Sequence, residues 1–223
     1  MRFATALLVA LALVTSSACG DGDDAAPAEP AGLEQRIVTA DEAPGSKPDP
    51  VETRQTTADF EEFIDVLRHI DPDTEEMTNV FREAGFEGAI IDTRFFGNAH
   101  SRSSPHIVSS VIQLQSEQGA ASALEWLEAD SKKPCPTTCA NQISEFDVNG
   151  VPDAWGVRRS QSSEDIEALG AEGDVPFDSY GMGFTHGSFV YTLDLFGPPG
   201  SVSEEQALGI ARALHERIVD LPS

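Results

Sequence analysis

The stretch Tyr180–Phe196 (YGMGFTHGSFVYTLDLF) decides the fold that we predict for this chain. Its second half alternates large apolar residues with other residues, which is the period of a strand that buries one face. The alternating residues are Phe189, Tyr191, Leu193 and Leu195. Because His186-Gly187 separates this run from a similar one at 180–185, the stretch predicts an antiparallel β-hairpin.

A helix is predicted directly after this hairpin. Ser203-Glu204-Glu205-Gln206 has the spacing of a capping box, which marks the first turn of a helix. The apolar residues that follow recur every three to four positions, so they share one helix face. They are Ala207, Ile210, Ala211, Leu214 and Ile218.

The rest of the chain repeats these two kinds of element. Helices are predicted over 59–70, 74–84 and 116–131, and strands over 88–96, 107–115, 143–148 and 154–159. Asn149-Gly150 predicts a tight turn between the last two strands. The fold class is therefore α+β, with a mostly antiparallel sheet of hairpins and amphipathic helices packed on one face.

The N-terminus has the pattern of an export signal. Arg2 precedes the apolar run 3–14, which as a helix would span about 18 Å and is too short for a hydrocarbon core of about 30 Å. Ser17-Ala18-Cys19 resembles the lipobox of bacterial lipoproteins, although Ser16 stands where that motif usually has Leu. The resemblance implies cleavage before Cys19 and acylation of its thiol, with an ordinary secretory signal as the alternative.

This gives three predicted parts. Residues 1–18 are a lipoprotein signal peptide, 19–57 are an acidic flexible tether, and 58–223 are a single α+β domain. The stretch after Cys19 is small, acidic and proline-containing, a composition that cannot bury enough apolar surface to order itself. A short strand at 33–38 is the one element that the tether could add.

The chain has 3 cysteines, and lipid on Cys19 leaves Cys135 and Cys139 as a pair. In an oxidising exported compartment, such a pair favours a disulfide. The alternative is a metal or thiol redox site, because the C-x-x-x-C spacing resembles the motif of Sco-type copper chaperones, which are also exported and membrane-anchored. That motif lies at a strand-to-helix turn with a downstream His, whereas this pair follows a predicted helix.

The charge of the chain excludes one class of partner. With 14 Lys+Arg against 38 Asp+Glu, the formal charge is -24, so nothing favours binding to nucleic acid.

The sequence contains no G-x-S-x-G, P-loop or H-E-x-x-H motif, and its 5 histidines lack ligand spacing. We therefore expect no enzyme activity, no cofactor and no metal site. The residues that could line a ligand cleft are Trp126, Trp155 and Tyr180.

Three further runs carry a resemblance to a family. They are Val111–Leu124 (VIQLQSEQGAASAL), Val148–Ala154 (VNGVPDA) and Gly187–Leu193 (GSFVYTL). They look like a pattern in exported actinobacterial lipoproteins, which include sensor-type extracellular domains. The resemblance implies export, an α+β sheet domain, and binding or signalling. Together with the lipobox, it leads us to expect a lipid-anchored protein on the outer face of the cell membrane that binds a small molecule or an envelope protein.

Overall fold

The computed structural model describes residues 32–51, 54–68, 74–97, 101, 104–133, 142–161 and 176–221. These residues form one eight-stranded sheet in the order β1-β3-β4-β8-β7-β6-β5, with β2 also paired to β3. Every strand pairing is antiparallel. The predicted α+β class and antiparallel sheet are therefore confirmed.

The strands and helices have the following bounds. The strands are β1 (Ser46–Pro48), β2 (Gln55–Thr57), β3 (Phe86–Phe96), β4 (His106–Leu114), β5 (Gln142–Glu145), β6 (Trp155–Gln161), β7 (Phe177–His186) and β8 (Phe189–Gly197). The helices are α1 (Phe60–Arg68), α2 (Thr74–Glu83), α3 (Glu117–Ser131) and α5 (Glu204–Ile218), preceded by the 3-10 turn η1 (Leu33–Gln35).

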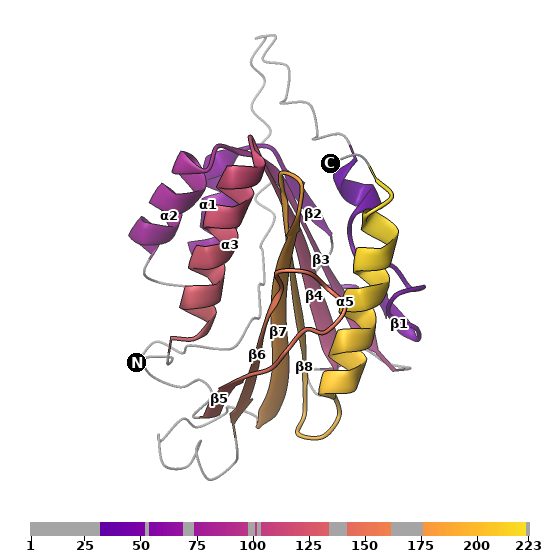
Figure 1. The fold of residues 1–223 in the computed structure, drawn as a ribbon. Helices are drawn as coiled ribbons and strands as arrows, with labels where there is room; N and C mark the ends of the chain where they lie inside the picture. Colours follow the sequence, from indigo (N-terminus) through magenta and orange to yellow (C-terminus); the bar gives the residue numbers. More distant parts are fainter. Residues whose placement is uncertain are drawn as a thin grey trace, which may run out of the picture.

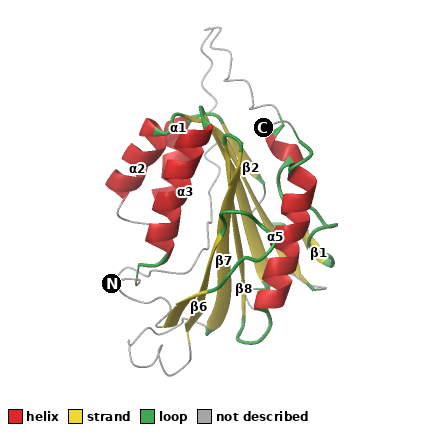
Figure 2. Cartoon of the chain, viewed as in Figure 1, coloured by secondary structure: helices red, strands yellow, loops and turns green. Residues whose placement is uncertain are grey.

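Helices cover both faces of the sheet, whereas the sequence predicted cover on one face. Helices α1, α2 and α3 pack on one side with one hydrophobic core, and α5 packs on the other side with a second core (Figure 1, Figure 2). Alternation along β8 divides its side chains between the two: Tyr191 and Leu193 belong to the α5 side, and Val190 belongs to the α3 side. A strand covered on both faces buries its alternate positions as well, including polar ones.

The predicted helix starts are confirmed by their caps. The Ser116 and Ser203 hydroxyls accept hydrogen bonds from the N–H groups of Gly119 and Gln206, 3.1 and 3.2 Å away. The side chain of Asp59 likewise accepts from the N–H of Glu62 at 3.0 Å. All five predicted core residues of α5 are buried.

A tight turn forms at Asn149-Gly150, since the N–H of Val151 donates a hydrogen bond to the carbonyl of Val148 at 3.2 Å, but the prediction that this turn directly joins the two strands is wrong. Strand β5 ends at Glu145 and β6 begins at Trp155, so a longer loop joins them. Gly150 has a positive φ of 94°, but Asn149 does not. The reason is tertiary, because Val148 and Val151 are buried in the α5-side core and draw the loop over the sheet.

The predicted boundary between tether and domain at residue 58 is also wrong. Residues 32–51 and 54–57 belong to the fold, since β1 and β2 both pair with β3. The predicted strand at 33–38 is instead η1 followed by irregular backbone. The apolar side chains of residues 33–43 are nevertheless almost fully buried in the α5-side core: Leu33, Ile37, Val38 and Ala43.

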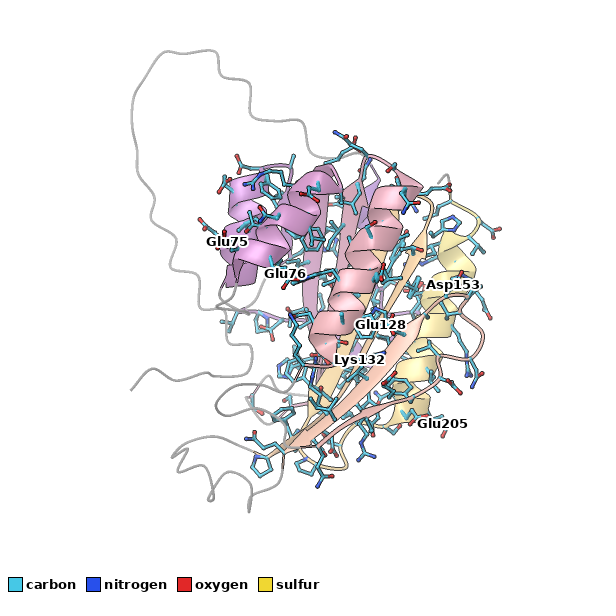
Figure 3. The ribbon with its side chains drawn as sticks, turned by 60° about the vertical axis from the view of Figure 1, so that its left-hand side comes forward. Glu75, Glu76, Glu128, Lys132, Asp153 and Glu205 are labelled. Carbon is cyan, nitrogen blue, oxygen red and sulfur yellow. The ribbon has the colours of Figure 1, made fainter. Side chains whose placement is uncertain are left out.

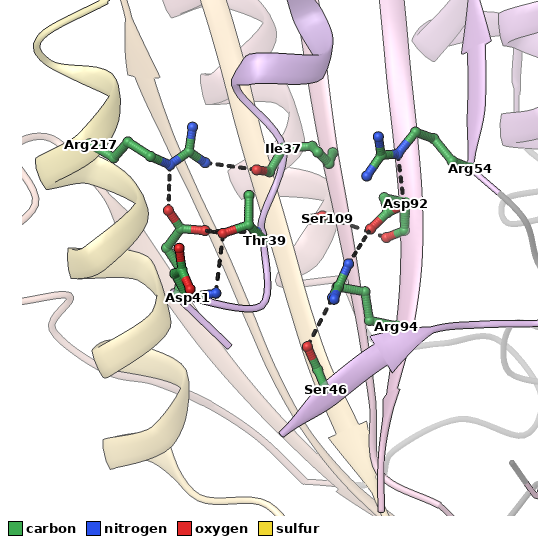
Figure 4. A network of polar contacts seen from close by, with 10 residues as sticks. Ile37, Thr39, Asp41, Ser46, Arg54, Asp92, Arg94, Ser109 and Arg217 are labelled. Carbon is green, nitrogen blue, oxygen red and sulfur yellow. Dashed lines mark hydrogen bonds and ion pairs between the residues drawn. The ribbon is translucent and has the colours of Figure 1, made fainter. Parts of the chain in front are cut away.

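Charged residues hold this N-terminal segment in place (Figure 4). Arg217 of α5 donates hydrogen bonds to the carbonyls of Gln35 and Ile37 and to the carboxylate of Glu42. Arg36 donates to the Tyr191 hydroxyl at 2.9 Å and lies 3.8 Å from the centre of the Phe189 ring. The segment is thus fixed to both α5 and β8.

The predicted signal peptide, Cys19 and the first part of the predicted tether lie outside the described residues. Among the helices that the structure describes, none is both long and apolar enough to cross a membrane.

Candidate functional site

Four side chains converge on the α3 side of the sheet around the bare backbone of Gly181. Gly181 on β7 is the direct register partner of Asp194 on β8. An ideal Cβ at Gly181 would lie 3.8 Å from the Trp155 ring and 3.9 Å from Arg159 Nη1. Ser179, one step along the same face of β7, completes what we call the Gly181 site, which consists of Trp155, Arg159, Ser179, Gly181 and Asp194.

Asp194 is the unusual member of this site. Although the residue keeps some contact with solvent, its Oδ1 is shielded from solvent and has no hydrogen-bond partner among the described residues. Burial raises the pKa of the Asp194 carboxyl, while the Arg159 charge and a hydrogen bond from Ser179 act in the opposite direction. A buried carboxyl oxygen without a partner destabilises the unbound protein, so the site is arranged for something beyond stability.

Trp155 supplies an unpaired donor beside this unpaired acceptor. Its Nε1 is buried without a hydrogen-bond partner in the described part of the chain. A Cβ at Gly183 would lie 2.6 Å from that Nε1, so only glycine lets the indole lie against the strand. Trp155 on β6 and Asp194 on β8 pair with Gly183 and Gly181, which are two residues apart on β7, so donor and acceptor flank the same stretch of that strand.

The C-terminal end of α3 is fastened next to this site. Arg159 Nη2 donates to the carbonyl of Ser131, the last residue of α3, at 2.6 Å. Lys132 bridges Glu128 at 2.7 Å and Glu145 of β5 at 2.8 Å, and Figure 3 shows Glu128 and Lys132 together on the end of the helix. These contacts hold Arg159 in position, with Nη1 toward Gly181.

The neighbouring strands extend the polar character of this face. Ser110 and Thr192, which are register partners on β4 and β8, have their hydroxyls 2.5 Å apart. His106 stacks on Phe196 with ring centroids 5.5 Å apart, and its Nε2 lies 3.4 Å from an Asp49 oxygen. This contact lies at the first residue of β4, a strand between β3 and β8.

The three aromatic residues predicted to line a ligand cleft do not come together. Trp155 is in the Gly181 site, but Trp126 lies on α3 with its ring 6.2 Å from that of Phe81. Tyr180 is buried on the opposite face, 6.0 Å from the Phe146 ring. Cys135 and Cys139 lie outside the described residues. Within the described ranges, no three His, Cys, Asp or Glu side chains are grouped to hold a metal ion.

A cavity of about 320 Å³ opens on the α5 side of the sheet. Its walls are residues 41–44, Phe96 at the end of β3, and Gln206, Gly209 and Ile210 of α5. Gly209 is inside the helix, yet an ideal Cβ there would have nothing within 4 Å. No close neighbour therefore requires glycine at this helix position.

Sequence reasoning missed Asp194, Arg159 and Gly209. The signal for Asp194 was its place between the apolar residues of β8, on the strand face that they do not occupy. Helices on both faces of the sheet bury a carboxylate at such a position. Arg159 carried no signal, because its role depends on the end of α3. Gly209 carried a weak one, since glycine inside a predicted helix costs about 1 kcal/mol relative to alanine.

The fold is that of an antiparallel α+β domain whose sheet is covered by helices on both faces. No protein-family model and no curated protein matches the chain. Among solved structures, it is similar to the extracellular domain of PknH from Mycobacterium tuberculosis, with a TM-score of 0.53 and 13% identity over 84% of this chain and 94% of that one. LpqN, involved in cell envelope biogenesis of Mycobacterium tuberculosis, has a TM-score of 0.29 and 16% identity over 58% of this chain and 69% of that one. The likeness to PknH establishes a shared fold at this identity.

Proposed function

We propose that this protein is an exported, lipid-anchored lipoprotein of the cell envelope, and that its domain binds a ligand without catalysis at the Gly181 site. The observation that carries the binding proposal is the buried, unpaired Oδ1 of Asp194. The fold shared with an extracellular domain agrees with an exported location. The anchor rests on the lipobox resemblance at Cys19.

The chemistry of the site selects the ligand. Asp194 offers an acceptor and Trp155 offers a donor, and both lack partners among the described residues. A ligand that presents a donor and an acceptor close together, as an amide or a pair of hydroxyls does, would satisfy both. The five residues of the Gly181 site include no histidine or cysteine, and the Ser179 hydroxyl donates a hydrogen bond to the Asp194 carboxyl.

The binding test compares small molecules that co-purify with four forms of the chain isolated from membranes. The forms are wild type, Asp194→Asn, Trp155→Phe and the control Trp126→Phe, which removes the other unpaired indole N–H. A lost hydrogen bond in a buried site weakens binding by about tenfold or more. We expect an amide- or hydroxyl-bearing compound with wild type and the control, depleted in the other two. Equal compound sets in all four forms, or none in any, would refute the proposal.

The anchor is tested separately by labelling cells with palmitate. Wild type should carry the label and Cys19→Ala should lose it. An unlabelled wild-type chain would show that Cys19 is not acylated, while leaving the binding test untouched.

A further inference from the structure

We propose that the cavity beside Gly209 is a second binding site, which takes a cationic amphiphile with a single short alkyl chain. The cavity and the Gly181 site lie on opposite faces of the sheet, so this inference is independent of the function proposed above. It rests on the volume of the cavity, on its apolar floor, on the acidic charge at its rim and on an otherwise unexplained helix glycine.

The floor of the cavity is apolar and its size is that of a short chain. Ala43 and Ile210 are buried in the surrounding core, and Phe96 packs against the same core. If each methylene-sized group needs about the 30 Å³ that a water molecule occupies in the liquid, then 320 Å³ holds about ten such groups. An eight-carbon chain with a small head group fits that volume.

Gly209 lies at the mouth of the cavity, on the exposed surface of α5. Glycine inside a helix destabilises it relative to alanine, and it is normally retained where a side chain would collide. Gly209 is exposed and lines the cavity, and no described atom lies within 4 Å of an ideal Cβ, so a side chain there would enter open space at the mouth of the cavity. Any larger side chain at this position would extend into that space.

The rim of the cavity is negative. Asp41 is exposed at the rim, and its backbone N–H, rather than its carboxylate, is bonded to Thr39 (Figure 4). The neighbouring Glu42 is already neutralised by Arg217. In a chain of formal charge -24, the Asp41 carboxylate favours a positive head group over a negative one.

The test uses the chain from residue 19 onward with Cys19→Ser, which removes the predicted lipid from competition. The probes are octyltrimethylammonium, 1-octanol and octyl sulfate, each titrated by calorimetry below its micelle concentration in 0.15 M salt. We expect one molecule of octyltrimethylammonium per chain, weaker binding of octanol, and the weakest binding of octyl sulfate.

Substitutions then locate the binding. Gly209→Leu places a large side chain at the mouth of the cavity and should weaken octyltrimethylammonium binding by about tenfold or more. Ala121→Leu, which adds a side chain of the same size at an exposed position of α3, is the matched control and should leave it unchanged. Asp41→Asn should weaken the cation by about two- to fivefold without affecting octanol, which is the strength of an exposed charge pair. Glu125→Gln, which removes an exposed charge elsewhere, should have no such effect.

Three results would overturn the inference. One is the absence of saturable binding by octyltrimethylammonium, and another is equal or tighter binding of octyl sulfate. The third is a Gly209→Leu chain that unfolds like wild type in a melting experiment but binds the cation with unchanged affinity. If that chain fails to fold, Gly209→Ala, which adds one methyl group to the cavity wall, replaces it and should still weaken binding.

Discussion

Two helix glycines of this protein are predicted to respond in opposite ways to the same substitution. Gly209 is inside α5 and Gly119 is in the first turn of α3. Alanine stabilises a helix interior by about 0.5–1 kcal/mol relative to glycine. Its backbone loses less conformational entropy on folding, and its methyl group shields the helix backbone from water. The propensity gain is therefore favourable at both positions, and the surroundings decide the sign.

The surroundings differ sharply between the two positions. At Gly209 the new methyl group would meet nothing within 4 Å, so the gain is kept in full. At Gly119 it would lie 2.5 Å from the carbonyl oxygen of Ala84, a backbone atom that can move only with the turn after α2. Forcing a methyl group into a packed contact costs about 1–3 kcal/mol. We expect Gly209→Ala to gain about 0.5–1 kcal/mol and Gly119→Ala to lose stability overall.

Urea unfolding followed by circular dichroism measures both changes. Gly209→Ala should raise the midpoint at unchanged m-value and raise Tm by about 1–4 °C, and Gly119→Ala should lower both. A destabilised Gly209→Ala would show that the space beside α5 is filled in the folded protein, and the cavity argument would fail. A stabilised Gly119→Ala would contradict the close contact between α3 and the turn after α2.

Three further predictions concern charge and the N-terminal segment. Because burial raises the pKa of the Asp194 carboxyl in the folded protein, its contribution to stability is complete below the ordinary Asp pKa of about 3.9 and is lost as the pH rises. Between pH 4 and 8, the free energy of unfolding of Asp194→Asn should therefore rise by about 1–3 kcal/mol relative to that of wild type. Parallel pH profiles of the two proteins would contradict this. For Glu42, burial raises the pKa, but bonds from Thr39 and Arg217 outweigh it and the net pKa is lowered. Glu42→Gln should therefore cost about 2–3 kcal/mol at pH 7, and the cost should vanish as the pH falls well below about 4.3; a constant cost across that range would show that its charge is irrelevant. A chain that begins at Gly32 should unfold like the full chain, whereas one that begins at Ala58 loses about 5–9 kcal/mol of apolar burial and should show no cooperative transition by circular dichroism.

The elements that the sequence predicted well are those whose pattern is local. The five core residues of α5 and the alternation along β8 follow from helical and strand periods, and the caps at Ser116 and Ser203 follow from side chains three residues away. Each of these depends on neighbours within one or two turns. Local physics therefore decides them before the chain has folded.

The errors occur where distant contacts decide the structure. Asn149-Gly150 forms the expected tight turn, but burial of Val148 and Val151 places it within a longer loop instead of directly between the two strands. Pro48 falls in the predicted tether, yet it belongs to β1, an edge strand, where a missing backbone donor is tolerated. The core residues of 32–43 have no strand or helix period, because hydrogen bonds from Arg36 to Tyr191 and from Arg217 to the carbonyl of Ile37 fix this segment. These partners are distant in the sequence and meet only in the folded chain.

The two candidate sites could not be predicted from the sequence, for one shared reason. Asp194 is unusual only once helices are known to lie on both faces of the sheet, and Gly209 only once its neighbours are known. Since the sites lie on opposite faces and share no residue, their substitutions should act independently. A chain with both Asp194→Asn and Gly209→Ala should show the sum of the two changes in unfolding free energy to within about 0.5 kcal/mol. A larger departure would mean that β8, which contributes to both cores, transmits a change at one site to the other.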